Sequence, residues 1–272
     1  MGVDVYSSEP PQNNPLIGLP NVVHTPHLGA STKEAQREVA RNMVAQVLDA
    51  LHGKDFRHAV NMPFQMEPGE YPQVRPYMNL AEKLGRLQAG LAEGVIRRVE
   101  VEASGDAVQS RVKAIAAALL KGILSADADI SPLNSINAPV IAEQKGIAIT
   151  QTRGMYNIDY PNLITCRVYW EGGERQLRWV LFGGQEPRIV QVDQYKLEAR
   201  PDGVILILQN QDVPGVIGQI GTILAAYEVN IGEWRMGRNE PGGEALSFIN
   251  LDSGTGGSGI RCIVEDNGRY AA

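Results

Sequence analysis

The sequence predicts a mixed α/β and α+β protein of several domains, and three observations support this. Its 272 residues are enough for two domains, or for three small ones. Short apolar strands and one long amphipathic helix near the N-terminus give way to successive hairpins after Leu163. A β-α-β-β order then starts after Gly203. We therefore expect a parallel α/β segment, an α+β domain and an incomplete ferredoxin-like βαββ module.

Composition excludes several classes of function. A net charge of -6 argues against nucleic-acid binding, which needs a basic face. No apolar run reaches the length of a membrane span, and MGVDVYSSEPP has no signal-peptide features. Cys166 and Cys262 lie too far apart in sequence to indicate a disulfide framework or metal cluster. We expect a cytoplasmic, soluble protein without metal, nucleic-acid partner or membrane partner.

The first segment predicts two short buried strands and a helix. The strands, GVDV (2–5) and NVVHT (21–25), are separated by the turn-rich SSEPPQNNPLIGLP. Ser31 is expected to cap the helix, with Glu34 completing a capping box, and Gly53 follows as a stop signal. One helical face is apolar and predicts packing on a neighbouring element; it comprises Ala35, Val39, Met43, Val47 and Leu51.

Residues 63–200 predict an α+β domain. The proline-rich NMPFQMEPGEYPQVRPY indicates a linker or domain edge before it. The alternation in VIRRVEVEASG predicts a strand, and the stretch from Leu163 to Gln194 predicts hairpins. Helices are expected over three ranges, namely 78–93, 110–124 and 137–145.

Residues 201–253 predict the βαββ module, with strands VILILQN, NIGEWRMGR and ALSFINLD around the helix PGVIGQIGTILAAYE. A closed ferredoxin-like module needs another helix and strand. The Gly/Ser-rich residues 254–272 lack helical periodicity and are interpreted as a flexible tail. GTGGSG within them matches G-x-G-x-x-G, but no helix follows to hold a pyrophosphate, so a nucleotide loop is rejected.

HTPHLGASTKEAQREVA, from His24 to Ala40, places two histidines just before the predicted helix. His27 thus lies at a strand end, where open α/β sheets bind ligands. Spacing alone leaves three interpretations open: a surface-loop histidine, a metal ligand with His24, or a catalytic acid/base. The metal pair is the weakest, since no third ligand is near.

The stretch GVDVYSSEPPQNNPLIGLPNVVHTPHLGAST resembles the C-terminal signature of the NAD-dependent D-isomer-specific 2-hydroxyacid dehydrogenases. Three segments match this signature together: DV…EP, NPL…LPNV and TPHLGAST. Residues 63–200 resemble the intervening domain of the long members of this family, and residues 203–252 resemble an ACT domain. The resemblance implies that residues 1–62 are a remnant of a Rossmann-type domain, the C-terminal part of the NAD-binding and catalytic domain.

The resemblance also assigns roles to residues. It makes His27 the general acid/base toward the substrate C2 oxygen, a role that suits an imidazole with a pKa near working pH. Glu9 would orient His27 and favour its protonated form. Asp4 would hydrogen-bond the nicotinamide carboxamide of NAD. The expected cofactor site also includes His27, together with Gly29 and Ala30. These two small residues would allow the cofactor or substrate to approach the backbone closely.

The implied reaction is NAD-dependent oxidation of 3-phospho-D-glycerate to 3-phosphooxypyruvate in L-serine biosynthesis, by a homo-oligomer (dimer or tetramer). The family's catalytic arginine and Gly-rich loop precede the segment that matches GVDV. We therefore expect this chain alone to be inactive. Two alternatives remain: a non-catalytic amino-acid sensor, and another D-2-hydroxyacid dehydrogenase.

The segment LQNQDVPGVIGQIG predicts an effector site. Asp212 is expected to cap the helix, with Pro214 tolerated near its first turn. A helix N-terminus attracts a carboxylate and an Asp can hold an ammonium, which suits an amino acid; the resemblance names L-serine. We predict that Asn210, Asp212 and Asn230 converge on one sheet edge facing a second subunit, which links ligand to dimerisation. Candidate contacts for an anionic substrate or effector in the intervening domain are Lys113, Arg153, Arg188 and Lys196.

Overall fold

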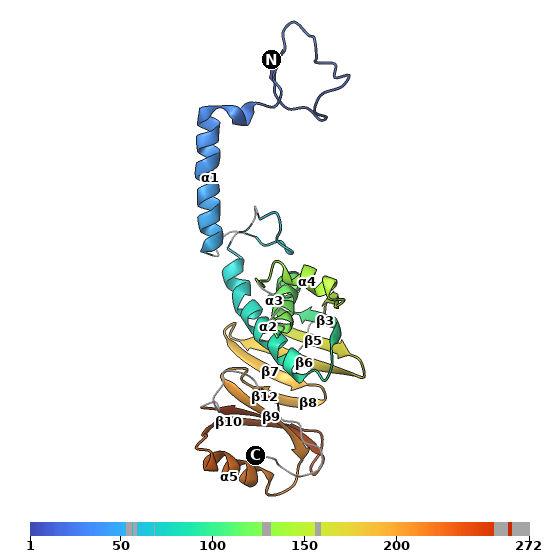
Figure 1. The fold of residues 1–272 in the computed structure, drawn as a ribbon, viewed down its shortest axis with the longest axis vertical. Coiled ribbons are helices and arrows are strands. Elements are labelled where there is room, and N and C mark those ends of the chain that lie inside the picture. Colours follow the sequence, from blue (N-terminus) through green and yellow to red (C-terminus); the bar gives the residue numbers. More distant parts are fainter. Residues whose placement is uncertain are drawn as a thin grey trace. The chain divides into compact units, whose positions relative to one another are not determined.

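The computed structural model describes residues 1–52, 56, 59–67, 69–126, 132–155 and 159–252, together with the backbone of 261–262. They divide into two compact units, Met1–Val60 with Met66–Tyr71, and Asn61–Gln65 with Pro72–Ala272. The second unit therefore contains both the predicted intervening and ACT domains. Helices and several sheets alternate along the chain (Figure 1), which confirms the mixed architecture. The GTGGSG stretch lies outside the described residues.

The first unit contains a parallel strand pair followed by a helix. Strands β1 (Gly2–Val3) and β2 (Val23–His24) pair in parallel, and both are shorter than predicted. Beyond them the backbones stay in contact, because the Thr25 amide donates to Val3 O at 3.1 Å and the His27 amide to Asp4 O at 3.0 Å. A 3-10 turn, η1 (Gly29–Ser31), then leads into α1 (Lys33–Leu51).

The start of α1 differs from the prediction by one residue. Thr32 is the N-cap, and its Oγ1 accepts a hydrogen bond from the Ala35 amide at 3.1 Å. The amide of Ser31 instead closes the 3-10 turn by donating to Leu28 O at 2.8 Å, so the predicted Ser31 capping box is wrong. No residue of α1 is buried in the described structure. The predicted packing of its apolar face on a neighbour is therefore not found there.

The second unit is built on a six-stranded sheet in the order β4-β3-β5-β6-β7-β8. All neighbours in it are antiparallel except β3 and β4, which are parallel. The edge strand β4, with the largely exposed sequence AITQTR, was not predicted because it lacks an apolar alternation. The strands are β3 (Ile96–Ser104), β4 (Ala148–Arg153), β5 (Leu163–Trp170), β6 (Gly173–Phe182), β7 (Glu186–Val192) and β8 (Tyr195–Ala199).

Helices α2 (Tyr71–Leu91) and α3 (Val112–Leu124) lie across this sheet (Figure 1). The turn η2 (Gln109–Arg111) precedes α3, and α4 (Ala138–Gln144) leads toward β4. The predicted helix 78–93 starts earlier, at Tyr71, and includes Pro76. Proline removes one intrahelical hydrogen bond. The buried side chains of Val74, Tyr77 and Met78 on either side of Pro76 stabilise the helix by packing.

Two glycines allow α2 and α3 to cross closely. A Cβ on Gly122 would lie 2.1 Å from the Glu82 carbonyl oxygen, and one on Gly85 would lie 2.2 Å from Leu119 O. The crossing therefore brings the two backbones together, and Lys121 Nζ donates to Glu82 Oε2 at 2.8 Å beside it. Fully buried side chains fill the space between helices and sheet, among them Leu84, Ile115, Leu119, Leu177 and Trp179.

The last part of the chain forms a four-stranded sheet in the order β10-β11-β9-β12. Strand β9 (Val204–Gln211), α5 (Val216–Ala226), β10 (Ile231–Arg238) and β11 (Glu244–Leu251) have the predicted βαββ order. Strand β12 (Arg261–Cys262) pairs in parallel with β9, so part of the predicted tail 254–272 joins the sheet. Helix α5 covers one face (Figure 1), where Leu208, Ile220 and Ile249 form a core.

The two sheets of the second unit meet through β8. Tyr195 donates its hydroxyl hydrogen to Glu244 Oε2 at 3.0 Å. A Cβ on Gly237 would lie 2.6 Å from Lys196 O, so the backbones of β8 and β10 approach closely there. This explains why the six-stranded and four-stranded sheets belong to one compact unit.

Candidate functional site

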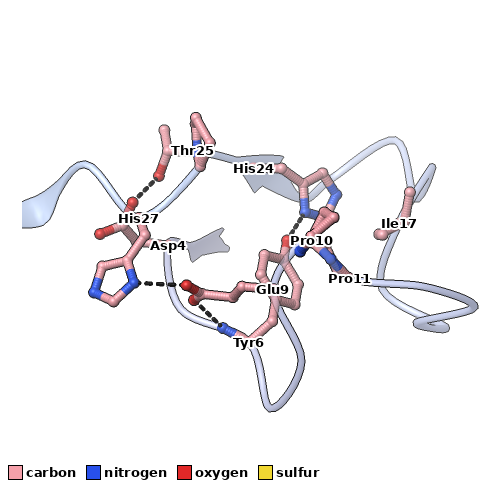
Figure 2. Close-up of a pocket in the computed structure, with 10 residues that line it drawn as sticks. Asp4, Tyr6, Glu9, Pro10, Pro11, Ile17, His24, Thr25 and His27 are labelled. Carbon is pink, nitrogen blue, oxygen red and sulfur yellow. Dashed lines mark hydrogen bonds and ion pairs between the residues drawn. The ribbon is translucent and has the colours of Figure 1, made fainter.

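A cavity of about 470 Å³ lies at the carboxyl ends of β1 and β2 in the first unit (Figure 2). Because the two strands are parallel, the residues that follow them meet at one end. Both polar segments that were predicted to form a site, around Asp4 and around His27, reach this end of the strand pair. The lining residues are Asp4, Tyr6, Glu9, Pro10, Pro11, Ile17, His24, Thr25, Pro26 and His27.

His27 and Glu9 form the pair that the family resemblance predicted to interact. Their atoms Nδ1 and Oε2 lie 2.8 Å apart, and Figure 2 shows the two side chains directed toward each other. His27 adopts a φ of 54°, a left-handed conformation that is uncommon for a residue with a side chain. Such backbone outliers concentrate at functional sites, and this one turns the imidazole toward the Glu9 segment.

The pair shifts both pKa values in opposite directions. The hydrogen bond that His27 donates to Glu9, and then the negative charge of Glu9, raise the pKa of His27 above its ordinary value. The hydrogen bond from His27, followed by that from the Tyr6 amide, lowers the pKa of Glu9. Both side chains remain accessible, with 57% and 36% of their surfaces exposed for His27 and Glu9. The arrangement is an imidazole that gains and loses a proton next to a permanent carboxylate.

Asp4 organises the turn that carries His27. Its Oδ1 accepts hydrogen bonds from Thr25 Oγ1 and from the Leu28 amide at 2.6 Å, and its Oδ2 accepts from the Gly29 amide at 2.7 Å. The Thr25 hydroxyl, then the Leu28 amide, lower the pKa of Asp4. Three of the roughly four acceptor positions of the carboxylate are thus taken, and Oδ2 keeps one for a further donor.

Gly29 and Ala30 lie in η1, and neither is among the described residues that line the cavity. A Cβ on Gly29 would lie 2.9 Å from Asp4 Oδ2. The close approach that the described structure shows at Gly29 is therefore to Asp4. The predicted contact of these two residues with a cofactor stays a prediction.

Two further lining residues, Tyr6 and His24, were not predicted as a pair. The Tyr6 hydroxyl and His24 Nδ1 form a hydrogen bond across the cavity wall (Figure 2), and the rings are stacked with centroids 6.2 Å apart. A signal existed, because HTPH places His24 three residues before His27 at the same strand end. The contact of His24 with Tyr6 could not be predicted without the register of β1 against β2.

The predicted effector residues do not converge within this chain. Strands β9 and β10 are both antiparallel to the strand between them, β11, and therefore run in the same direction. Asn210 and Asp212 lie at the carboxyl end of β9, whereas Asn230 precedes β10 at the opposite end of the sheet. The prediction of one edge was wrong because a β-α-β crossover returns the chain to the end where the first strand began.

Each effector residue has a local partner. Asp212 forms an ion pair with Arg238, which lowers the pKa of its carboxyl, and Asn230 donates to Asp252 Oδ2. Asn210 Nδ2 donates to Gln211 O at 2.6 Å. The predicted capping by Asp212 is wrong, because α5 begins at Val216.

The N-cap of α5 is Gly215, with a φ of 101° and no side-chain cap, so Pro214 lies before the helix rather than in its first turn. The amides of the first turn are therefore not satisfied by a capping side chain.

The basic residues predicted in the intervening domain come from separate elements: Lys113 from α3, Arg153 from β4, Arg188 from β7 and Lys196 from β8. Arg188 is ion-paired with Glu186 at 3.1 Å. A second cavity, of about 530 Å³, lies between α2, the β6–β7 turn and Asp202, and none of the four lines it. Lys83, which does line it, is ion-paired with Asp202.

No three His, Cys, Asp or Glu side chains in the described part of the chain are placed to hold a metal ion. None of the described helices is long and apolar enough to cross a membrane.

Comparison with known proteins gives consistent matches. Residues 73–193 match the family model of the D-3-phosphoglycerate dehydrogenase intervening domain. The chain is 36% identical, over 92% of its length, to D-3-phosphoglycerate dehydrogenases of Methanocaldococcus jannaschii and of Synechocystis sp.. The enzyme of Bacillus subtilis is 33% identical over the same share. The chain spans about half the length of these relatives, between 45% and 47%.

Proposed function

We propose, from the premise that this chain belongs to the D-3-phosphoglycerate dehydrogenase family, that it carries the acid/base pair for NAD-dependent oxidation of 3-phospho-D-glycerate. The product would be 3-phosphooxypyruvate, on the route to L-serine. The observation that carries the proposal is the 2.8 Å contact of His27 Nδ1 with Glu9 Oε2 beside a cavity at two parallel strand ends.

In this proposal His27 moves the proton. Its Nδ1–H donates to Glu9, so the lone pair of Nε2 is the one that takes a proton from the C2 hydroxyl of the substrate. The imidazolium that forms lies beside the Glu9 carboxylate, whose charge stabilises it. In the reverse direction the same imidazolium returns the proton to the C2 oxygen. Glu9 itself stays ionised, as its lowered pKa requires.

The residues present fit the nicotinamide end of NAD. When bound, NAD supplies the acceptor for the hydride that leaves C2. Asp4 Oδ2 has one acceptor position left after binding the Gly29 amide, and a carboxamide N–H can fill it. The bonds from Thr25 and Leu28 hold Asp4 in place for this contact. Asp4 thus links the turn that carries His27 to the cofactor.

Two alternative functions are weaker. A non-catalytic amino-acid sensor has no use for a histidine held in a left-handed conformation against a glutamate. Another D-2-hydroxyacid dehydrogenase would share the pair, but residues 73–193 match the intervening domain of D-3-phosphoglycerate dehydrogenase specifically.

A chimera tests this function. The chain replaces the matching segment of the M. jannaschii enzyme, which is 36% identical to it. We expect NADH formation from 3-phospho-D-glycerate, and much slower formation from D-glycerate or D-lactate. A chimera that folds but prefers one of the unphosphorylated acids would contradict the substrate. One that folds and reduces NAD with none of them would support the sensor.

We also propose that the ACT-like segment binds L-serine between two copies of the chain. Strand β10 is at an edge of its sheet and can pair with β10 of a second copy about a two-fold axis. Antiparallel pairing places the start of one β10 beside the end of the other. Asn230 of the second copy would then lie near Arg238 and its partner Asp212. The pairing restores the convergence that one chain lacks.

The chemistry of that end suits a zwitterion. The uncapped first turn of α5 offers amides to a carboxylate. Asp212, ionised because of its lowered pKa, can hold an ammonium in exchange for part of its contact with Arg238. Asn210, at the end of β9, lies at the same end of the sheet. A bound ligand would therefore stabilise the dimer.

A further inference from the structure

The Tyr6–His24 contact links the two strand ends below the catalytic pair. Tyr6 follows β1 and His24 ends β2, so their hydrogen bond joins segments 18 positions apart in the sequence. The rings also stack, with 27° between their planes. The Nε2 atom of His24 is buried and has no hydrogen-bond partner among the described residues. The hydroxyl of Tyr6 is therefore the polar contact that orients this imidazole in that part of the chain.

Tyr6 also contacts Glu9 directly. Its backbone amide donates to Glu9 Oε1 at 3.1 Å, while the other oxygen, Oε2, holds His27. Figure 2 shows the resulting series of contacts, from His24 through the Tyr6 side chain and backbone to Glu9 and then to His27. Three of its links are hydrogen bonds, and Tyr6 is the residue that takes part in two of them.

We propose that Tyr6 and His24 are positioning residues for the Glu9–His27 pair, an inference that rests on the proposed function of that pair. The hydroxyl of Tyr6, held by His24, fixes the turn that follows β1. The amide of Tyr6 then holds one oxygen of Glu9 and directs the other to His27. Neither residue needs to touch the substrate for this role.

Exposure explains why such support is needed. A solvent-accessible ion pair contributes little free energy to stability, because ordering two side chains costs conformational entropy and water screens their attraction. Glu9 and His27 are 36% and 57% exposed, so their contact belongs to this class. A second hydrogen bond, from the Tyr6 amide, restricts the rotamers of Glu9 before His27 is engaged. The entropy cost of forming the pair falls accordingly.

The test measures the titration midpoint of His27 in the full 272-residue chain by NMR, with isotope-labelled histidines. The chain has four histidines, and single His→Gln variants assign them. Tyr6→Phe keeps the ring and removes the hydroxyl. We expect it to lower the His27 midpoint by at least half of the shift that Glu9→Gln produces. Tyr71→Phe, the same chemical change outside the cavity, should leave the midpoint unchanged.

A double-variant cycle separates positioning from a general structural effect. In the Glu9→Gln background, Tyr6→Phe should shift the His27 midpoint no further, because it acts through Glu9. His24→Leu should behave like Tyr6→Phe, and His24→Asn, which retains a hydrogen-bonding atom near the position of Nδ1, should restore part of the shift. A wild-type midpoint in both Tyr6→Phe and His24→Leu would overturn the proposal. So would an equal shift with and without Glu9.

This readout needs no substrate and is independent of turnover. If the cycle gives the expected result and the chimera forms no NADH, the proposed function fails and the positioning role stands. If NADH forms and the cycle shows no coupling, only the positioning role fails. Circular dichroism of each variant reports whether the chain is folded.

Discussion

His27 Nδ1 and Glu9 Oε2 lie 2.8 Å apart, and the carboxylate raises the pKa of the imidazole. Oxidation requires the unprotonated imidazole as base, so the rate in the active chimera should increase as pH rises through the pKa of His27. Glu9→Gln removes the charge and lowers that pKa. We expect the rising limb of the pH–rate profile to move to lower pH in this variant, with a lower maximal rate. A rising limb at the same pH in both proteins would show that Glu9 does not raise the pKa of His27.

The crossing of α2 and α3 gives a prediction about stability. Gly122→Ala would place a Cβ 2.1 Å from Glu82 O. Because this oxygen belongs to the backbone, the clash can be relieved only by a shift of the helix. We expect the free energy of unfolding to fall by about 1–3 kcal/mol, measured by denaturant titration.

Gly90→Ala is the matched control for this prediction. Gly90 is in α2, and no atom beyond its own stretch of helix lies within 4 Å of an added Cβ. It should be neutral or stabilise by up to about 1 kcal/mol, through helix propensity. Equal effects of the two substitutions would show that the helices do not pack as described.

Cys166 should be chemically inert in the folded protein. Burial raises the pKa of its thiol to about 12, so almost no thiolate is present at neutral pH. In a Cys262→Ser variant, which leaves one cysteine to react, we expect no reaction with a disulfide reagent under native conditions. Full reaction should follow in denaturant. Rapid native labelling would show that the core around Gln88 and Cys166 opens.

The proposed serine site makes a prediction that only a two-copy site satisfies. Calorimetric titration should show that Asp212→Ala and Asn230→Ala each lose L-serine binding. In a mixed dimer of the two variants, one site combines an intact Asp212 with an intact Asn230 from the other copy. Mixing should therefore restore part of the binding. Glu240→Ala, in the β10–β11 turn, is the control that should bind normally.

Sedimentation of the same samples measures the linkage. Serine should increase the dimer fraction of the wild-type chain and leave that of each single variant unchanged. No recovery on mixing, or serine binding without any effect on association, would refute the two-copy site.

The candidate site shows what could be predicted from sequence. The strand–histidine–helix pattern placed His27 at a strand end, and the resemblance paired it with Glu9. The structure brings these two together with Asp4. Tyr6 and His24 could not be joined in advance, because their contact depends on the parallel register of two very short strands. The close neighbour of Gly29 in the structure is Asp4, and its predicted contact with a cofactor stays a prediction.

The errors in the fold have similar causes. Alternating apolar residues predicted β3, but β4 is an exposed edge strand with no such pattern. Pro76 suggested a linker, and the burial of α2 against the sheet overrides that local signal. The predicted place of Asn230, beside Asp212, was wrong because β9 and β10 run in the same direction, which only the ladders reveal.

The central claim is that His27 is the acid/base of the oxidation, and the kcat of His27→Ala in the active chimera tests it most directly. We predict a loss of about 10²–10⁴-fold in kcat, with little change in KM, because the substrate still binds while its C2 hydroxyl keeps its proton. A His27→Ala chimera with the kcat of the unsubstituted chimera would contradict the account.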